Sequence, residues 1–282
     1  MGYSPRALEY SRSTVRLSRT RETTLSAETP AIAGPIAARL RRDNTIAALV
    51  HLLQAAAVLA LASSFALPVT AAYLQGPPGT PATDPEVLFD IPTGAAVAGF
   101  LALSALAHLL VGTAWRSHYL ADLARHRNQA RWVEYSVSSS LMIVLIAQLV
   151  GIADVAALLA LFGVNASMIL FGWLQERDEA PGEGGWLPFF FGCLAGVVPW
   201  LAIAVYLLSL GSTSSAAPPG FVYGIFASLF VFFNVFAMNQ WLQYRARGRW
   251  SDYLFGERIY ILLSLTAKSA LAWQIFAGTL AS

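Results

Sequence analysis

The segment IYILLSLTAKSALAWQIFAG, residues 259–278, contains twenty residues and a single charged side chain, that of Lys268. An α-helix rises about 1.5 Å per residue, so a run of this length can cross the roughly 30 Å hydrocarbon core of a bilayer. The whole chain agrees, because 56% of its 282 residues are hydrophobic and only 12% are charged. A soluble domain carries about a quarter of its residues as charged ones. The sequence therefore indicates a membrane protein and argues against a soluble enzyme or a nucleic-acid-binding domain.

Seven apolar runs of this kind occur along the chain, and each is bounded by polar or turn-forming residues. The segments between them are typical of loops, since the one after the first run contains four prolines. We therefore predict an all-α membrane protein, a bundle of seven transmembrane helices formed by residues 44–282 and surrounded by lipid. The predicted spans cover residues 45–74, 92–115, 131–150, 153–174, 186–210, 220–244 and 256–280.

The arginines are distributed unevenly among the connecting segments. Of seventeen, eight precede the first span, four lie between the second and third or at the first residue of the third, one lies between the fourth and fifth, and four lie between the sixth and seventh or in the first turn of the seventh. The remaining connecting segments carry none. Because cytoplasmic loops carry the excess of basic residues, we expect a multi-pass protein of the cell membrane with its N-terminus in the cytoplasm and its C-terminus outside.

Residues 1–43 are polar and rich in arginine and serine, and they lack the apolar stretch of a signal peptide. We expect them to form a disordered cytoplasmic tail. Their arginines can contact anionic lipid headgroups or serve only solubility and topology, and the sequence leaves both open.

Two fully ionisable residues lie well inside the predicted spans, Glu134 in the third and Lys268 in the seventh. An unpaired charge at the centre of a bilayer costs at least about 2.5 to 3.5 kcal/mol, so each needs a partner. The helical rise places Glu134 roughly 24 Å and Lys268 roughly 18 Å from the outer surface. The lysine stem can bridge that difference, so we expect the two side chains to pair.

Four further polar residues fall at a similar depth. His51 and His108 both lie roughly 24 Å from the outer face, and Ser104 and Ser264 lie one helical turn before His108 and Lys268. The interior therefore holds a predicted polar cluster on the cytoplasmic side. The histidines can equally be packing residues that are hydrogen-bonded to neighbouring helices.

A lysine held in a dry pocket is nucleophilic and can condense with an aldehyde to form a Schiff base. Retinal is the aldehyde that suits a seven-helix cavity, and Glu134 supplies the anion that a protonated Schiff base needs. A purely structural ion pair is the alternative.

The segments RWVEYSVSSS, residues 131–140, and SLTAKSALAW, residues 264–273, resemble the heliorhodopsins. The likeness extends over roughly residues 44–280, and the inverted orientation is itself a mark of that family. The resemblance implies all-trans retinal bound to Lys268, with Glu134 as its counterion. It also implies that Ser104, Ser264, His51 and His108 surround the Schiff base. The implied pocket along the polyene consists of Tyr135, Ser139, Asn165, Met168, Pro199, Trp200, Phe233 and Gln240.

The resemblance further implies a light sensor with a slow photocycle, no ion pumping and no enzymatic activity. Light would isomerise the retinal, and the Schiff-base proton would pass to Glu134 or to the cluster of histidines and water. Family members usually form dimers, so we expect a homodimer, and the cytoplasmic signalling partner is unknown. Arginines of the inner loops, such as Arg125, Arg177 and Arg245, can contact that partner or merely set the topology.

Two alternatives remain at this stage. The first is a light-driven or light-gated ion transporter, although a pump needs carboxylates on both sides of its switch, and none lies outward of Lys268 before Asp154. The second is a retinal-free membrane protein in which Lys268 and Glu134 form a binding or structural pair.

Overall fold

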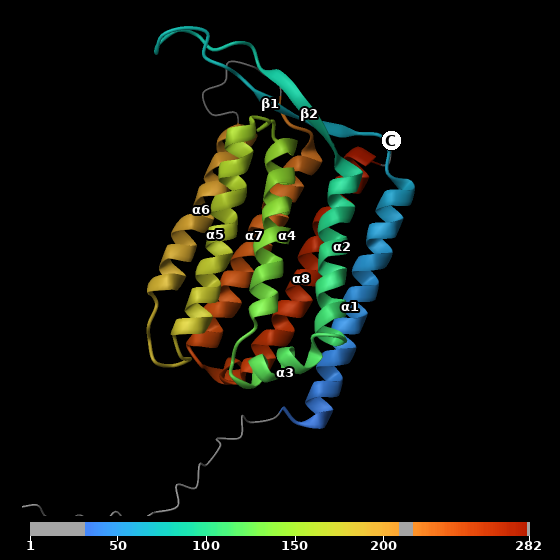
Figure 1. Cartoon of the computed structure of the whole chain (residues 1–282), viewed down its shortest axis with the longest axis vertical. Coiled ribbons are helices and arrows are strands. Elements are labelled where there is room, and N and C mark those ends of the chain that lie inside the picture. The colour runs from blue at the N-terminus through green and yellow to red at the C-terminus, as the bar shows by residue number, and fades with distance from the viewer. Residues whose placement is uncertain (1–31, 209–216, 281–282) are drawn as a thin grey trace, which may run out of the picture.

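Seven long helices form the body of the molecule in a computed structural model that describes residues 32–208 and 217–280. All seven are long and apolar enough to cross a membrane, and they stand side by side in one bundle (Figure 1). The predicted seven-helix fold is therefore confirmed. The helices are α1 (Gly34–Leu61), α2 (Thr93–Gly112), α4 (Gln129–Leu149), α5 (Val155–Asp178), α6 (Leu187–Leu207), α7 (Gly220–Tyr244) and α8 (Tyr253–Ile275).

The first helix begins earlier than the sequence predicted. It starts at Gly34, with Pro35 in its first turn, where the missing N–H of proline costs no hydrogen bond. Residues 34–43 are thus helical, so our expectation of a disordered tail is wrong for this part, and residues 1–31 lie outside the described residues. The helix is amphipathic there: Leu40 is buried, whereas Arg41 and Arg42 are exposed.

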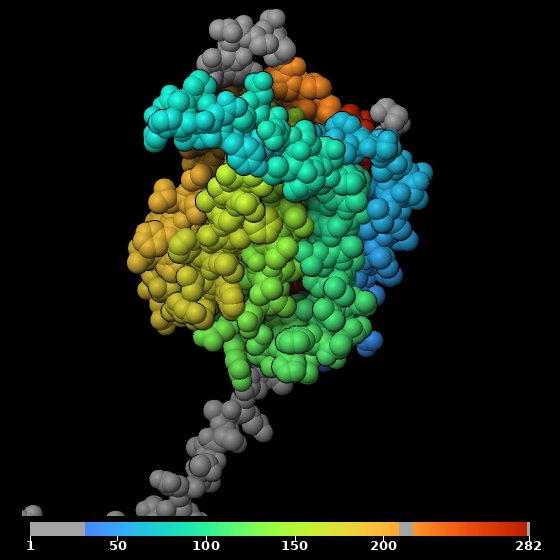
Figure 2. Space-filling view, turned by 45° about the horizontal axis from the view of Figure 1, so that its top comes forward, coloured from blue at the N-terminus to red at the C-terminus, as the bar shows by residue number. Residues whose placement is uncertain are grey.

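The connection between α1 and α2 contains a β-hairpin where we expected helix followed by loop. Strand β1 (Ala66–Ala71) pairs with β2 (Glu86–Pro92) in an antiparallel two-stranded sheet, with an irregularity between Val69 and Thr70. The backbone N–H of Thr70 also donates to the carbonyl of Ala153, which holds the hairpin to the start of α5. The hairpin lies across one end of the bundle, which we call the hairpin end (Figures 1 and 2).

A short helix, α3 (Arg116–Ala124), follows α2 at the opposite end of the bundle, which we call the α3 end. The 3-10 turn η1 (Gly248–Ser251) joins α7 to α8 there as well. Beyond α8, residues Phe276–Leu280 form a π-helical turn at the hairpin end, where the carbonyl of Leu280 accepts the backbone N–H of Ser63.

The main apolar core occupies the hairpin side of the bundle interior. Fully buried side chains from α2, α4 and α8 meet there, including Phe100, Ile143 and Leu271. Many large apolar side chains on the outer faces are exposed, as expected for helices that face lipid. The buried ionisable residues of the described helices lie outside this core, and their position defines the site.

Candidate functional site

Lys268 of α8 and Glu134 of α4 meet inside the bundle, as the depth estimate predicted. The lysine Nζ lies 2.7 Å from Glu134 Oε1, and the side chains are only 4% and 7% exposed. Ser104 of α2 donates its hydroxyl to the same carboxylate oxygen at 2.6 Å. The lysine Nζ also lies 5.0 Å from the centre of the Tyr135 ring, so an aromatic face covers it. The amine, the carboxylate and the hydroxyl thus form one buried group that joins three helices.

The other members of the predicted polar cluster lie beside this group. Ser264, one turn before Lys268, is buried, and its hydroxyl has no hydrogen-bond partner among the described residues. The His51 and His108 rings stack with their centres 5.8 Å apart. His108 Nδ1 lies 2.8 Å from Asn44 Oδ1, whereas both ring nitrogens of the buried His51 have no partner within residues 32–208 and 217–280.

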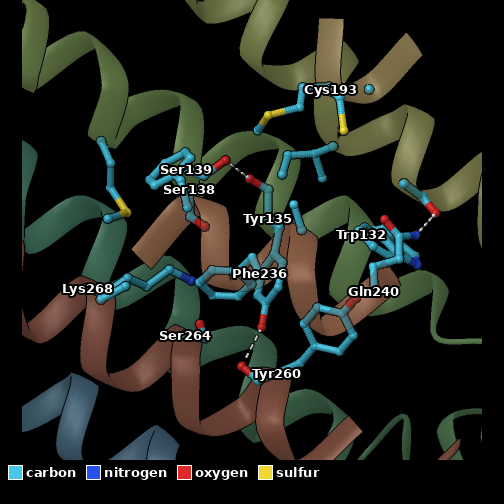
Figure 3. Close-up of a pocket in the computed structure, with 18 of the residues that line it drawn as sticks. Trp132, Tyr135, Ser138, Ser139, Cys193, Phe236, Gln240, Tyr260, Ser264 and Lys268 are labelled. Atoms are coloured by element: carbon cyan, nitrogen blue, oxygen red, sulfur yellow. Dashed lines mark hydrogen bonds between the residues drawn. The ribbon is translucent and has the colours of Figure 1, made fainter. Parts of the chain in front are cut away.

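A cavity extends from Lys268 between α4, α5, α6, α7 and α8, and the lysine points into it toward Tyr135 and Phe236 (Figure 3). The volume of this cavity is about 110 Å³. Most of its wall is apolar or aromatic. The lining residues are Trp132, Tyr135, Ser138, Ser139, Met142, Met168, Ile169, Gly172, Phe189, Gly192, Cys193, Phe233, Phe236, Ala237, Gln240, Tyr260, Ser264, Ala267 and Lys268.

Five of the eight predicted pocket residues line this cavity, namely Tyr135, Ser139, Met168, Phe233 and Gln240. The Gln240 amide donates to the carbonyl of Gly172 at 2.8 Å, which fixes its side chain at the wall.

The other three predicted pocket residues, Asn165, Pro199 and Trp200, do not line the cavity. Asn165 supports the wall from behind, because its amide donates to Ser139 Oγ at 2.9 Å and to Ser140 Oγ at 3.0 Å. Pro199 is buried within α6. Trp200 packs edge-on against Phe233, which does line the cavity, with ring centres 5.3 Å apart. Hydropathy identifies aromatic residues in a span but not which way each faces.

A second group of buried charges, near the α3 end, was missed by the sequence analysis. Arg131 of α4 bridges Glu176 of α5 and Glu257 of α8, and all three side chains are at most 4% exposed. Arg131 Nη2 donates to Glu176 at 2.6 Å, and Arg131 Nη1 donates to Glu257. These residues stand at the ends of their helices, where the predicted span boundaries placed them in loops or at the surface. We call them the Arg131 cluster.

Neighbouring donors complete the hydrogen bonding of the Arg131 cluster. Glu176 accepts from the backbone N–H of Asn128, the indole of Trp132 and the hydroxyl of Tyr253, at 2.6 to 2.8 Å. Glu257 accepts from the Asn128 amide at 2.6 Å and from the hydroxyl of Tyr119 at 3.3 Å. Tyr119 belongs to α3, outside the spans, and burial together with the Glu257 carboxylate raises the pKa of its hydroxyl well above the ordinary value.

A second cavity lies between Glu134 and the Arg131 cluster. The volume of this second cavity is about 40 Å³, which exceeds the roughly 10–15 Å³ that one water molecule needs. Both ends of its wall are ionisable, with Glu134 at one end and Glu257 at the other. The remaining lining residues are Asn44, Ala107, His108, Val111, Tyr119, Asn128, Ala130, Arg131, Tyr135 and Ile261.

This arrangement suits a conjugated aldehyde such as retinal. A single amine projects into a cavity walled by aromatic rings and apolar chains, and an anion stands beside that amine. Such walls favour a flat apolar polyene, and the carboxylate balances a positive charge held at Nζ. Ser138 and Ser264 lie on the same wall, and their hydroxyls, which have no partner in the described part of the chain, can hydrogen-bond to a bound group.

Comparisons with known proteins agree with the geometry. The family model described as heliorhodopsin matches residues 40–280. No curated protein matches the chain. Among solved structures, the transmembrane domain and linker region of the rhodopsin phosphodiesterase from Salpingoeca rosetta is similar, with a TM-score of 0.61 and 12% sequence identity. The similarity covers 85% of this chain and 79% of that one, and at this identity it supports a shared fold alone.

The family model spans all seven long helices, from α1 to the π-helical turn after α8. It also includes both members of the ion pair at the end of the first cavity. The chain therefore belongs to the heliorhodopsin family of membrane-embedded retinal photoreceptors.

Proposed function

We propose that this chain is a light sensor in which all-trans retinal is joined covalently to Lys268 as a protonated Schiff base. The observation that carries the proposal is the 2.7 Å contact between Lys268 Nζ and Glu134 Oε1 at the end of the apolar cavity. An amine that pairs with a buried carboxylate and faces an apolar wall has the surroundings that a charged, pigmented linkage requires. When bound, retinal supplies absorption of visible light and isomerisation.

The residues of the chain have separate tasks in this proposal. Glu134 is the counterion of the proton on Lys268 Nζ, and Ser104 orients the carboxylate by donating to it at 2.6 Å. The aromatic rings of Phe233 and Phe236 restrict which part of a bound polyene can turn. The stacked imidazoles of His51 and His108 lie beside Lys268 and Glu134, where they can accept a proton that leaves Lys268 Nζ.

The proposed function includes sensing without ion pumping, and the asymmetry of the interior supports this. From the level of Lys268 to the hairpin end, the described helix segments carry no Asp, Glu, His or Arg. Toward the α3 end, the interior contains Glu134 and the Arg131 cluster, with His108 on the wall of the second cavity. A pump needs proton acceptors and donors on both sides of its switch, and within the described helices the ionisable groups lie at the level of Lys268 or on its α3 side.

The proposed orientation places the α3 end in the cytoplasm and the hairpin end outside. The arginines support it, because Arg125, Arg127, Arg177 and Arg245 all lie in or beside the connections at the α3 end. The hairpin and the start of α5, at the other end, carry only acidic charges.

Reconstitution with retinal tests the cofactor assignment. Purified protein mixed with all-trans retinal should develop a visible absorption band, and Lys268→Ala should not. Cys193→Ala is the matched control, because Cys193 lines the same cavity away from the amine and should leave the band present. A band that persists in Lys268→Ala would exclude covalent attachment at this lysine.

Illuminated liposomes separate a sensor from a pump. We expect no sustained change of pH in the bulk solution, with or without a protonophore. A protonophore-sensitive change that disappears in Glu134→Gln would show that the chain transports protons.

We further propose that the chain forms a homodimer through the hairpin. Strand β2 pairs with β1 along one edge, and its Val87 and Phe89 are 59% and 54% exposed. An exposed apolar edge strand favours pairing with a second strand. Light scattering of the purified protein should therefore give a dimer, and Phe89→Lys should give a monomer. A dimer that persists in Phe89→Lys would place the interface elsewhere.

A further inference from the structure

The Arg131 cluster holds more negative than positive charge. Its two carboxylates, Glu176 and Glu257, share one guanidinium, and all three groups are buried. The hydrogen bonding suits two carboxylates. Every group that contacts their four oxygens is an N–H or O–H donor, including two from Asn128 and one each from Trp132, Tyr119 and Tyr253. The cluster can therefore take up one proton and become neutral.

A line of polar side chains connects the Arg131 cluster with the surroundings of Glu134. His108 Nδ1 lies 2.8 Å from Asn44 Oδ1, the Asn44 amide donates to Tyr119 Oη at 3.4 Å, and Tyr119 donates to Glu257 at 3.3 Å. All four residues line the second cavity, whose volume admits water. Because an amide is a poor proton carrier, we assign the proton transfer to water molecules in the cavity. The line of polar side chains keeps that water in position.

We propose that Glu257 is the site that accepts the proton lost from Lys268 Nζ after illumination. The inference rests on the proposed function, since light acting on the bound pigment drives the proton from Nζ. The N–H bond at Nζ breaks and leaves its electron pair on nitrogen, and an O–H bond forms on the Glu257 carboxylate. In the dark the proton returns to Nζ by the same cavity.

Glu257 is better placed than Glu176 to take this role. Glu257 lines the second cavity, whereas Glu176 does not and already accepts four hydrogen bonds. The ionisable groups around Glu257 come from five helices, whereas α1 contributes the uncharged Asn44 to the second cavity. They are His108 of α2, Tyr119 of α3, Arg131, Glu134 and Tyr135 of α4, Glu176 of α5, and Tyr253 and Tyr260 of α8.

Protonation of Glu257 would change the contacts at the α3 end of the bundle. A neutral acid holds Arg131 less tightly than a carboxylate does, and Arg131 joins α4 to α5 and α8. Tyr119, which donates to Glu257, anchors α3 by the same contact. The proton would thus bias the position of α3, at the end of the bundle that the proposed orientation puts in the cytoplasm.

Infrared difference spectroscopy tests the proposal on the pigmented full chain. Illumination should produce a carbonyl band of a protonated carboxylic acid when Lys268 Nζ loses its proton. The band should shift in Glu257→Asp, which keeps the acid and changes its carbonyl frequency, and vanish in Glu257→Gln. In Glu176→Gln it should remain unshifted or nearly so. A band that ignores both Glu257 variants, or its absence while Nζ loses its proton, would overturn the proposal.

The Tyr119 hydroxyl supplies an independent readout. Tyr119→Phe interrupts the polar line to Glu257, so return of the proton to Nζ, followed by recovery of the visible band, should slow by roughly tenfold or more. Tyr223→Phe is the matched control, because Tyr223 donates to the carbonyl of Leu207 at the other end of the bundle. Equal recovery rates in the two variants would contradict the route through the second cavity.

These outcomes are distinguishable from a failure of the proposed function. If no visible pigment forms with retinal, the light-sensing proposal fails. If the pigment forms and Nζ loses its proton while Glu257 stays ionised, only the acceptor assignment fails.

Discussion

The two halves of the bundle interior, on either side of Lys268, are built from different chemistry. The half toward the hairpin is filled by apolar side chains such as Phe100, Ile143 and Leu271. The half toward α3 contains a water-sized cavity and the Arg131 cluster. Lys268 and Glu134 stand at the boundary. A proton that leaves this boundary meets ionisable groups toward α3, whereas the described helix segments toward the hairpin carry no Asp, Glu, His or Arg. The structure therefore favours proton transfer on the α3 side.

The largest expected effect comes from removing the charge at the boundary. Glu134→Gln leaves the positive charge at Lys268 Nζ without an anion, so the pigment should lose its proton and absorb in the near ultraviolet at neutral pH. Absorption spectra of the retinal-bound variant measure this. Glu183→Gln, at an exposed acid near the start of α6, should keep the visible band. An unchanged spectrum in Glu134→Gln would mean that another anion is the counterion.

The next effect concerns stability in the polar half. Arg131→Gln leaves two buried carboxylates without their guanidinium and should lower the free energy of unfolding by about 3–5 kcal/mol. In the apolar half, Ile143→Ala should cost about 2–5 kcal/mol through lost packing. Denaturant unfolding in detergent compares the two, and Arg177→Gln, at an exposed ion pair, should show no measurable change. A loss under about 1 kcal/mol for Arg131→Gln would mean that the cluster is as weak as a surface pair.

The smallest effect concerns the two ends, where the halves should not differ. Asp154 caps α5 at the hairpin end by accepting from the backbone N–H groups of Ala156 and Ala157, and Asp252 caps α8 at the α3 end by accepting from Leu254. Replacing either aspartate by alanine should lower stability by about 0.5–2 kcal/mol. The same unfolding experiment measures both variants. A clearly larger loss for Asp252→Ala would show that the α3 end depends on its cap to hold the Arg131 cluster.

Much of the fold could be predicted from the sequence because the relevant signals are local. Hydropathy located seven spans, and helical rise placed Glu134 and Lys268 at depths from which they could meet. The Arg131 cluster escaped because its members stand at the span ends, where a charge costs little and is read as part of a loop. Their burial comes from α3 and the neighbouring helix ends, which hydropathy does not place.

Other features depended on rotation and pairing rather than on hydropathy. The segment ALPVTA, residues 66–71, continues an apolar run and therefore resembled the end of a helix, but it pairs with β2 as a strand. Trp200 was predicted to line the cavity, whereas it is absent from the lining and packs against Phe233, which lines it. The rotation of α6 about its axis decides this, and nothing in its nearly uniform apolar sequence marks which side faces inward.

The central claim is that Lys268 carries the chromophore, and locating retinal on the chain tests it most directly. Chemical reduction of the Schiff base makes the linkage permanent, after which protease digestion and mass spectrometry identify the modified residue. We predict that the mass of retinal appears on the peptide that contains Lys268 and on no other. Retinal recovered on a different residue, or released unbound from pigment that had visible colour before reduction, would contradict the account.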